Sequence, residues 1–190
     1  MSLVSVLLSV LIVLTFLSTS ISSKAQADSG RKSFPLASSA FAPGASIPKP
    51  YTCSGADHSP ELHWGDPPAH STIPPGTKTF ALIMDDPDAP SGTWVHWTVW
   101  NMPSTVHEIA MDFPREAERP DGTRQGRNDF GKVGYNGPCP PAGKTHRYFF
   151  RVYAVDAKLD LAPGATRAEL DSALKGHVLA EVEYMGTYRR

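Results

Sequence analysis

Three long apolar runs, each bounded by turn-forming residues, most constrain what this chain can fold into. They cover Thr77–Met84, Thr93–Asn101 and His146–Val155. Within each run, side chains of similar polarity recur at every second residue, which is the period of a β-strand. The chain also holds 18 prolines and 15 glycines, which favour turns and loops between such runs. The pattern therefore predicts a mainly β protein, an antiparallel β-sandwich.

The stretch from Phe34 to Pro75 carries only short apolar pieces among Pro, Gly and Ser. Short apolar pieces between turn residues predict short strands. Arg115–Gly134, by contrast, is polar and has no hydrophobic period, which predicts a long loop. The predicted short strands are Ser38–Phe41, Tyr51–Cys53 and Leu62–Trp64.

One helix is predicted near the C-terminus. Thr166 and Glu169 have the spacing of a capping box, and Leu170 begins an apolar set at helical spacing. Gly176 ends this segment. The following residues either extend the helix or form a last strand, and we expect a strand over Val182–Tyr188.

The first residues of the chain have the pattern of a secretory signal peptide. Leu3–Leu17 is almost wholly apolar, and Ala25-Gln26-Ala27 matches an A-x-A cleavage pattern. We therefore expect a signal peptide over residues 1–27, one domain over residues 28–190, and a secreted or periplasmic location. An uncleaved N-terminal anchor is the alternative, because no Lys or Arg precedes the apolar run. That run is short for a bilayer core of about 30 Å, so no integral membrane segment is expected after cleavage.

The charge of the mature chain excludes some partners. Removal of residues 1–27 takes away one charge, Lys24, and leaves 190 − 27 = 163 residues with a net charge of (18 − 1) − 19 = −2. A near-neutral chain without a basic run lacks the electrostatic footprint of a nucleic-acid-binding protein. It also contains no GxxxxGK[ST] or GxGxxG motif, so we expect no nucleotide P-loop and no cofactor.

Cys53 and Cys139 are the two cysteines. An even count in an exported chain favours a disulfide. The bond would span 139 − 53 = 86 residues, and the chain-entropy model gives a loop of that size about 4.5 kcal/mol of stabilisation, less any strain. Two reduced, partly buried thiols are the alternative. Without further cysteines or a CxxC motif, a structural zinc site is not predicted.

Polar residues at the ends of the long runs predict a binding pocket. Asp86 continues the core-facing side of the first run, so it is expected to be buried and to need a partner, for which His96 is the nearest candidate in sequence. His146 and Tyr148 lie two residues apart, on one face of their run. Protonated histidines donate from both ring nitrogens. These residues together favour a site for phosphate or carboxylate.

Stiff turns flank these residues. The Gly137–Gly143 loop can offer backbone N–H groups to an anion, as anion-binding nests do, while its prolines lack such groups and stiffen it. Asp88, in an Asp-Pro turn, is expected to cap that turn by accepting hydrogen bonds from nearby amides.

Two catalytic interpretations compete with binding. Asp86, His96 and His146 could ligate a metal, but no H-E-x-x-H motif supports this, and we expect no metal. A hydrolase would need an activated nucleophile, and the chain has no G-x-S-x-G motif. A non-catalytic pocket is therefore the main interpretation, and a metal-dependent or other hydrolase is the weakest alternative.

At these residues the chain resembles the phosphatidylethanolamine-binding protein family, also known as Raf kinase inhibitor-like proteins, and in particular its prokaryotic YbhB/YbcL-type branch. The resemblance covers most of the chain after Phe34. It rests on Tyr51–Asp57 with Ser59-Pro60, Asp86-Pro87-Asp88-Ala89-Pro90, His96-Trp97, Asn128–Gly131, Gly137–Pro141, His146-Arg147-Tyr148 and Met185–Tyr188.

The resemblance implies a compact antiparallel β-sandwich with one or two short helices near the C-terminus, and a pocket for phosphate-like head groups and other small anions. Eukaryotic members carry Gly where this chain has Cys139, whereas Cys is usual in the bacterial and archaeal branch. Kinase partners are therefore not implied. Carried over to this chain, the ligand-binding residues are Asp86, Pro90, His96, Gly137, Cys139, Pro141, His146 and Tyr148.

Members of the family are known as kinase modulators, serine protease inhibitors and lipid head-group binders, and fold likeness does not choose among these roles. An exported chain favours a small anionic ligand or phospholipid head group as the partner. Inhibition of an extracellular serine protease, through an exposed loop such as Arg115–Gly134, is the alternative.

Overall fold

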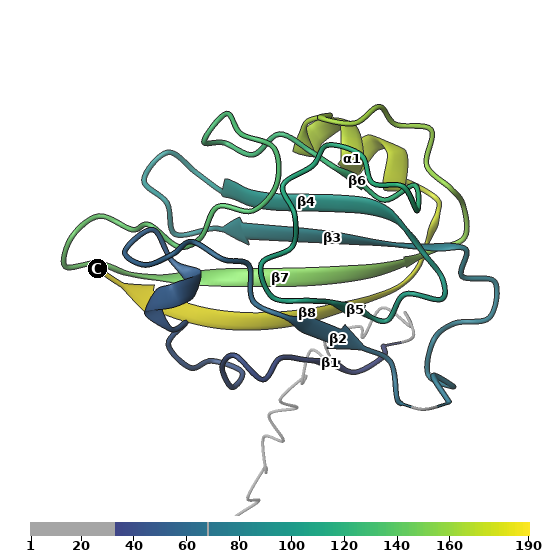
Figure 1. Cartoon of the computed structure of the whole chain (residues 1–190), viewed down its shortest axis with the longest axis horizontal. Coiled ribbons are helices and arrows are strands. Elements are labelled where there is room, and N and C mark those ends of the chain that lie inside the picture. The colour runs from purple at the N-terminus through teal and green to yellow at the C-terminus, as the bar shows by residue number, and fades with distance from the viewer. Residues whose placement is uncertain (1–32, 68) are drawn as a thin grey trace, which may run out of the picture.

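The structure, a computed structural model, describes residues 33–67 and 69–190 (Figure 1). The predicted signal peptide over residues 1–27 lies outside the described residues. The fold consists of two antiparallel sheets, as predicted: a five-stranded sheet of order β6-β4-β3-β7-β8 and a three-stranded sheet of order β1-β2-β5. The strands are β1 (Leu36–Ala37), β2 (Leu62–Trp64), β3 (Thr79–Asp86), β4 (Trp94–Pro103), β5 (Glu108–Ile109), β6 (Arg124–Gln125), β7 (Thr145–Val155) and β8 (Val178–Arg189).

Strand β3 lies in the middle of the larger sheet and is buried along its whole length. Phe80, Leu82 and Met84 point into the core between the two sheets. Ala81 and Ile83 point to the opposite face, into a second apolar cluster. Burial on both faces explains why this run is continuously apolar rather than alternating.

The second cluster is covered by helix α1 (Arg167–Leu174), which buries Leu170 and Leu174. The predicted capping box is present, because the Thr166 backbone N–H donates to the Glu169 carboxylate (2.7 Å) and the Thr166 hydroxyl accepts from the Glu169 backbone N–H (3.4 Å). The chain then enters β8, which pairs with β7 along almost its full length. The expected last strand is thus confirmed, and it is longer than predicted.

Two of the predicted short strands are wrong. Ser38–Phe41 is not a strand: the Ser38 hydroxyl donates to the Glu61 carbonyl (2.7 Å), a local alternative to ladder pairing, and β1 lies just before it. Tyr51 ends a 3₁₀ turn, η1 (Lys49–Tyr51), which has a proline in its first turn. Proline is favoured at that position. Its ring fixes φ at a value that suits the helical turn, and the N–H that it lacks would have no partner within the turn.

A β-bulge changes the face on which His96 lies. Trp97 and Val95 of β4 pair with two consecutive residues of β3. His96, which lies between them in sequence, is therefore the extra residue of the bulge. Strict alternation would place His96 on the face of Trp100, beneath α1. Instead its ring packs edge-on against Tyr148 in the core between the sheets, with ring centroids 5.2 Å apart.

The polar stretch Arg115–Gly134 is tied to β4 rather than free. It contains β6, and the Gln125 side-chain amide donates to the carbonyls of Pro114 (2.6 Å) and Glu116 (2.7 Å). The Trp97 indole N–H in turn donates to the Gln125 side chain (2.8 Å). Within residues 33–67 and 69–190, no helix is long and apolar enough to cross a bilayer.

Candidate functional site

A cavity of about 380 Å³ lies where β3 ends and where β4 and β7 begin. This volume is within the range of small-molecule sites. Its wall brings together segments that are far apart in sequence. From the predicted set, the lining includes Asp86, Pro90, His96, Cys139, Pro141 and His146; the remaining lining residues are Ala89, Ser91, Trp94, Phe130, Pro140 and Arg190.

Asp86 is paired with His146, not with His96 as sequence proximity suggested. Its Oδ2 atom lies 2.8 Å from the His146 Nδ1, and both side chains are almost completely buried. Its Oδ1 atom accepts from the Asp88 backbone N–H (2.8 Å). The carboxylate therefore caps the Asp-Pro turn and orients the histidine at the same time, because a carboxylate oxygen is an acceptor for the His146 Nδ1–H.

His96 is held by the backbone. Its Nδ1 lies 2.6 Å from the carbonyl oxygen of Asn136, which identifies Nδ1 as the donor. Burial lowers the pKa of His96, and the Asn136 carbonyl and the charge of Asp86 only partly oppose this effect. His96 is thus a neutral ring at pH 7 in the empty cavity. Both histidines use Nδ1 within the protein, which leaves Nε2 on each ring for a ligand.

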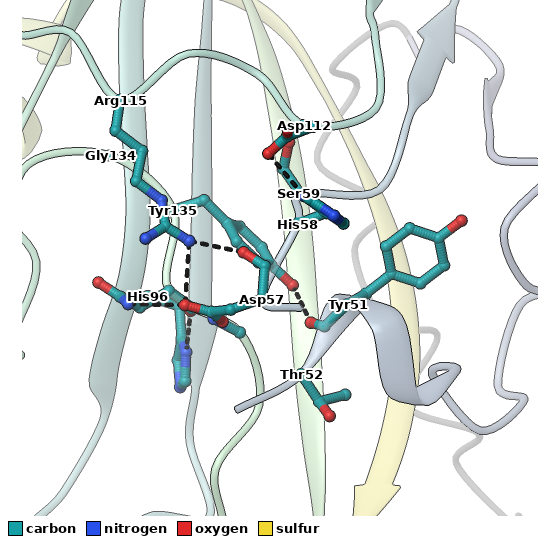
Figure 2. A network of polar contacts seen from close by, with 12 residues as sticks. Tyr51, Thr52, Asp57, His58, Ser59, His96, Asp112, Arg115, Gly134 and Tyr135 are labelled. Atoms are coloured by element: carbon teal, nitrogen blue, oxygen red, sulfur yellow. Dashed lines mark hydrogen bonds and ion pairs between the residues drawn. The ribbon is translucent and has the colours of Figure 1, made fainter. Parts of the chain in front are cut away.

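A polar network behind the cavity, which the sequence analysis missed, holds the segment that anchors His96 (Figure 2). Asp57 accepts from the Gly137 backbone N–H (2.7 Å) and from the Asn136 side-chain amide (2.9 Å). Arg115 donates to the same Asp57 carboxylate at 3.0 Å. Asp57 has φ +62°, a left-handed conformation that Asp tolerates better than most residues. Its position directly after Ser54-Gly55-Ala56, in a turn, was the available signal.

The predicted disulfide is present and forms part of the cavity wall. Cys53 and Cys139 are bonded, with their Cα atoms 5.4 Å apart. Next to the bond, the Cys53 backbone N–H donates to the Pro138 carbonyl (3.2 Å). The turn after η1 is thereby joined to the wall segment by both a covalent bond and hydrogen bonds.

Gly137 and Tyr148 do not line the cavity. The Gly137 amide is used by Asp57, and a Cβ atom at this position would lie 2.2 Å from the Tyr51 carbonyl oxygen, so Gly is required for packing. Tyr148 is fully buried behind His96. Its hydroxyl has no hydrogen-bond partner among the residues that the structure describes, and burial, together with the charge of Asp86, raises its pKa well above the usual value.

Aromatic and cationic residues at the rim were not predicted. Trp94 and Phe130 meet edge to face, with ring centroids 5.5 Å apart, and Phe130 also contacts the ring of His96 (5.3 Å). Phe130 is a large apolar side chain that is left exposed. Arg190 reaches the wall from the end of β8, where its guanidinium lies 3.4 Å from the Cys139 sulfur. The alternation of Trp94 with His96 was a signal for the first of these residues.

Asp88 does not cap its own turn. Its carboxylate accepts from the Arg147 backbone N–H (2.9 Å) and from the Arg147 guanidinium (2.8 and 2.6 Å). The hydrogen bonds from Arg147 lower the pKa of Asp88 to about 2. This pair holds the start of β7, and with it His146, against the turn that follows β3.

The described part of the chain contains no group of three or more His, Cys, Asp or Glu side chains arranged to hold a metal ion. Asp86 and the two histidines line the same cavity, but their polar contacts are with one another and with the backbone. The arrangement suits hydrogen bonding from two fixed imidazole rings and a guanidinium.

The architecture is that of a β-sandwich with a cavity of small-molecule size at one end of its larger sheet. The chain belongs to the phosphatidylethanolamine-binding protein family, whose model matches residues 37–189. Members of this family are binding proteins. The resemblance seen in the sequence is thereby confirmed.

Two bacterial proteins and one archaeal protein illustrate the likeness. The chain is 49% identical over 155 residues to a UPF0098 protein of Aquifex aeolicus, with 80% of this chain and 86% of that protein covered. It is 46% identical to a UPF0098 protein of Methanothermobacter thermautotrophicus, covering 82% and 98% of the two chains. Among solved structures, E. coli YbcL, described as a member of the mammalian PEBP family, matches with a TM-score of 0.71 and 34% identity over 83% of this chain and 98% of its own.

Proposed function

We propose that this chain is an exported, non-catalytic binding protein whose cavity holds a phosphate-type or other small anionic group, such as a phospholipid head group. The observation that carries the proposal is the buried Asp86–His146 pair (2.8 Å) at the wall of a cavity that His96 also lines. A buried carboxylate that fixes one ring nitrogen directs the other nitrogen to a ligand.

The charges of the wall suit an anion. Arg190 contributes a guanidinium, a permanent cation that can bond two oxygens of a phosphate or carboxylate. The Nε2 of His146 donates to an anion when the ring is protonated. His96 is neutral in the empty cavity, so its Nε2 accepts a hydrogen bond from a protonated ligand oxygen or takes up a proton when the anion binds.

Apart from Ser91, the rest of the wall is apolar, which favours an organic ligand over a bare inorganic ion. Pro90, Pro140 and Pro141 line the cavity together with Trp94 and Phe130. Such surfaces pack against carbon and attract cationic groups through the ring faces. The family name refers to phosphatidylethanolamine, which combines a phosphate with an ammonium group. Export rests on the predicted signal peptide, and it would bring the protein to lipid surfaces outside the cytoplasm.

The test is a thermal-shift titration of residues 28–190, unreduced, with phosphate, phosphoethanolamine and acetate at pH 6 and pH 8. We expect a saturable stabilisation that prefers the phosphate compounds and weakens at pH 8. The variant His96→Ala/His146→Ala should lose it. The matched control is His177→Ala, an exposed histidine paired with Asp156 at the other end of β7, which should bind normally. Unchanged binding by the double variant, or turnover of phosphoethanolamine, would refute the proposal.

A further inference from the structure

The two sulfur atoms of the disulfide lie in different surroundings. Cys53 is exposed at the surface, whereas Cys139 is half-buried and lines the cavity. Cys139 has a cation beside it, because the Arg190 guanidinium donates to its sulfur at 3.4 Å. An incoming thiol can therefore reach Cys53, while a negative charge that develops on Cys139 is stabilised.

We propose that the Cys53–Cys139 bond is a thiol-exchange site: an external dithiol reductant attacks the Cys53 sulfur, Cys139 leaves as a thiolate in the ligand cavity, and this reaction lowers the affinity of the cavity for its anion. The second half of this inference rests on the proposed function. Exposed disulfides are the ones that exchange readily, whereas enclosed ones resist reduction.

The exchange is balanced in two steps. In the first step, one thiolate of the reductant forms a bond to the Cys53 sulfur, the bond between the two cysteines breaks, and its electron pair leaves with Cys139. In the second step, the other thiol of the reductant, as a thiolate, attacks the mixed disulfide and releases Cys53 as a thiolate. The protein gains two electrons and, once both thiolates are protonated, two protons, and the reductant ends as its own disulfide.

Arg190 determines which of the two sulfur atoms is attacked and which one leaves. Exchange is faster when the leaving thiol is the better acid, and a neighbouring guanidinium stabilises a thiolate. Cys139 meets this condition through its contact with Arg190. The same charge change affects the cavity, because a Cys139 thiolate competes with a ligand for Arg190 and repels an anion.

The protein should stay folded after reduction, because other contacts hold residues 135–137, next to Cys139. Asp57 binds Asn136 and Gly137 through side-chain hydrogen bonds of 2.9 and 2.7 Å. The Tyr135 hydroxyl donates to the Tyr51 carbonyl at 2.6 Å, as Figure 2 shows. The covalent anchor is thus one of several, and its loss changes the wall at Cys139 more than it changes the core.

Binding and redox state are then linked in both directions. If reduction weakens anion binding ten-fold, a saturating anion must shift the reduction potential of the disulfide by about 30 mV toward the oxidised form. We expect a coupling of about five-fold or more, the lower bound of common allosteric couplings.

The first experiment locates the attack. The unreduced protein, residues 28–190, is exposed briefly to glutathione, quenched by alkylation and mapped by mass spectrometry. We expect the mixed disulfide on Cys53, and an exchange rate lowered about three-fold or more in Arg190→Gln. The matched control, Arg189→Gln, removes the adjacent exposed charge and should exchange at the normal rate. An adduct mainly on Cys139, or equal rates in both variants, overturns the exchange site.

The second experiment measures the affinity for inorganic phosphate by calorimetry, before and after reduction by dithiothreitol, with circular dichroism as the check on folding. If the reduced protein is folded and its affinity for phosphate is lower by about five-fold or more, the coupling is supported. Equal affinity before and after reduction overturns it. If reduction unfolds the chain, the same titration on folded Cys53→Ala, which breaks the disulfide and keeps the Cys139 thiol beside Arg190, decides. If the oxidised protein does not bind phosphate at all, the proposed function fails and so does the coupling, while the adduct map still decides the exchange site.

Discussion

Asp85 and Asp86 are consecutive residues at the end of β3, and both are only 3% exposed, yet their surroundings have little in common. Asp85 points to the face that α1 covers, where it accepts from Arg151 through both oxygens (2.8 Å each) and from Arg167 (2.9 Å). Asp86 points into the core between the sheets and meets a single histidine at the edge of a cavity.

The difference lies in how completely each charge is compensated. Two guanidiniums surround Asp85, and each is itself bound to another carboxylate, on Glu183 or Asp171. Asp86 forms its ion pair with a single imidazole, that of His146, whose second ring nitrogen is left for a ligand. A fully paired charge holds elements together, whereas a charge paired with an imidazole can respond to what binds beside it. Four predictions test this contrast, in order of decreasing effect.

The largest effect is expected from Asp85→Asn. Removal of this charge leaves two guanidiniums, each about a quarter exposed, without their shared partner. The loss of one member of a buried ion pair costs 3–5 kcal/mol, and the partial exposure favours the lower limit, about 3 kcal/mol. Urea denaturation of the variant measures this directly. Anion binding by the folded fraction should be unchanged, and a loss of less than about 1 kcal/mol would erase the distinction between the two aspartates.

Asp86→Asn should have the opposite effects: a small change in stability and a clear loss of affinity for the anion. The Asn side-chain oxygen can still accept from the His146 Nδ1, so stability should change by no more than about 1 kcal/mol. The charged acceptor that orients the His146 ring toward a ligand is lost, so the affinity for phosphate should fall about ten-fold, equal to about 1.4 kcal/mol. Calorimetric titration at pH 6 checks the affinity. A variant that unfolds easily and binds normally would show that Asp86 is a structural residue like Asp85.

The pH dependence of stability should differ between the protein without an anion and the protein with an anion bound. Because burial lowers the pKa of His96, the unfolded chain takes up this proton at a higher pH, near its ordinary value of about 6.5, than the folded chain does. The stability of the empty protein should therefore fall as the pH drops below about 6.5. A bound anion favours the protonated ring, so the added stabilisation by sulfate should grow over the same range.

Thermal melts from pH 8 to pH 5, with and without sulfate, check both slopes. His107→Ala is the control, because burial also lowers the pKa of His107, which lines a different cavity. Removal of this histidine should leave the sulfate effect in place. Parallel slopes with and without sulfate would separate His96 from anion binding.

The smallest effect is expected from Glu183→Gln. Glu183 belongs to the same network as Asp85, but its side chain is 45% exposed. Exposed ion pairs contribute about 0–1 kcal/mol, and Arg151 keeps Asp85 as its partner. Urea denaturation should show a loss within that range. A loss as large as that of Asp85→Asn would mean that the network, rather than the burial of one carboxylate, determines the stability of this face.

Much of the fold could be read from local patterns. The three long runs became β3, β4 and β7, and the capping box at Thr166 began α1. These patterns succeeded because burial on a strand and capping of a helix depend on neighbours in sequence. The short pieces Ser38–Phe41 and Tyr51–Cys53 failed, because side-chain hydrogen bonds and a proline outweighed the weak preference of a few apolar residues.

The partners of the site residues could not be read in the same way. Asp86 pairs with a residue 60 positions away, and Asp88 with one 59 positions away, although nearer candidates were available. The Asp57 network and the contribution of Arg190 depend on segments that meet only in the folded chain. Sequence proximity was the wrong guide, because antiparallel pairing of β3 with β7 places the end of one strand beside the start of the other.

The amino-acid sequence by itself determined the mainly β class, the helix and its cap, the disulfide, the family, and which residue types could form an anion site. The tertiary structure alone decided which histidine Asp86 orients, which face His96 occupies, and which residues close the cavity. The physical reason is that strand period and capping are local properties, whereas a single β-bulge at His96 reverses the direction of a side chain. Such a bulge depends on the register between strands, which only the packed sheet settles.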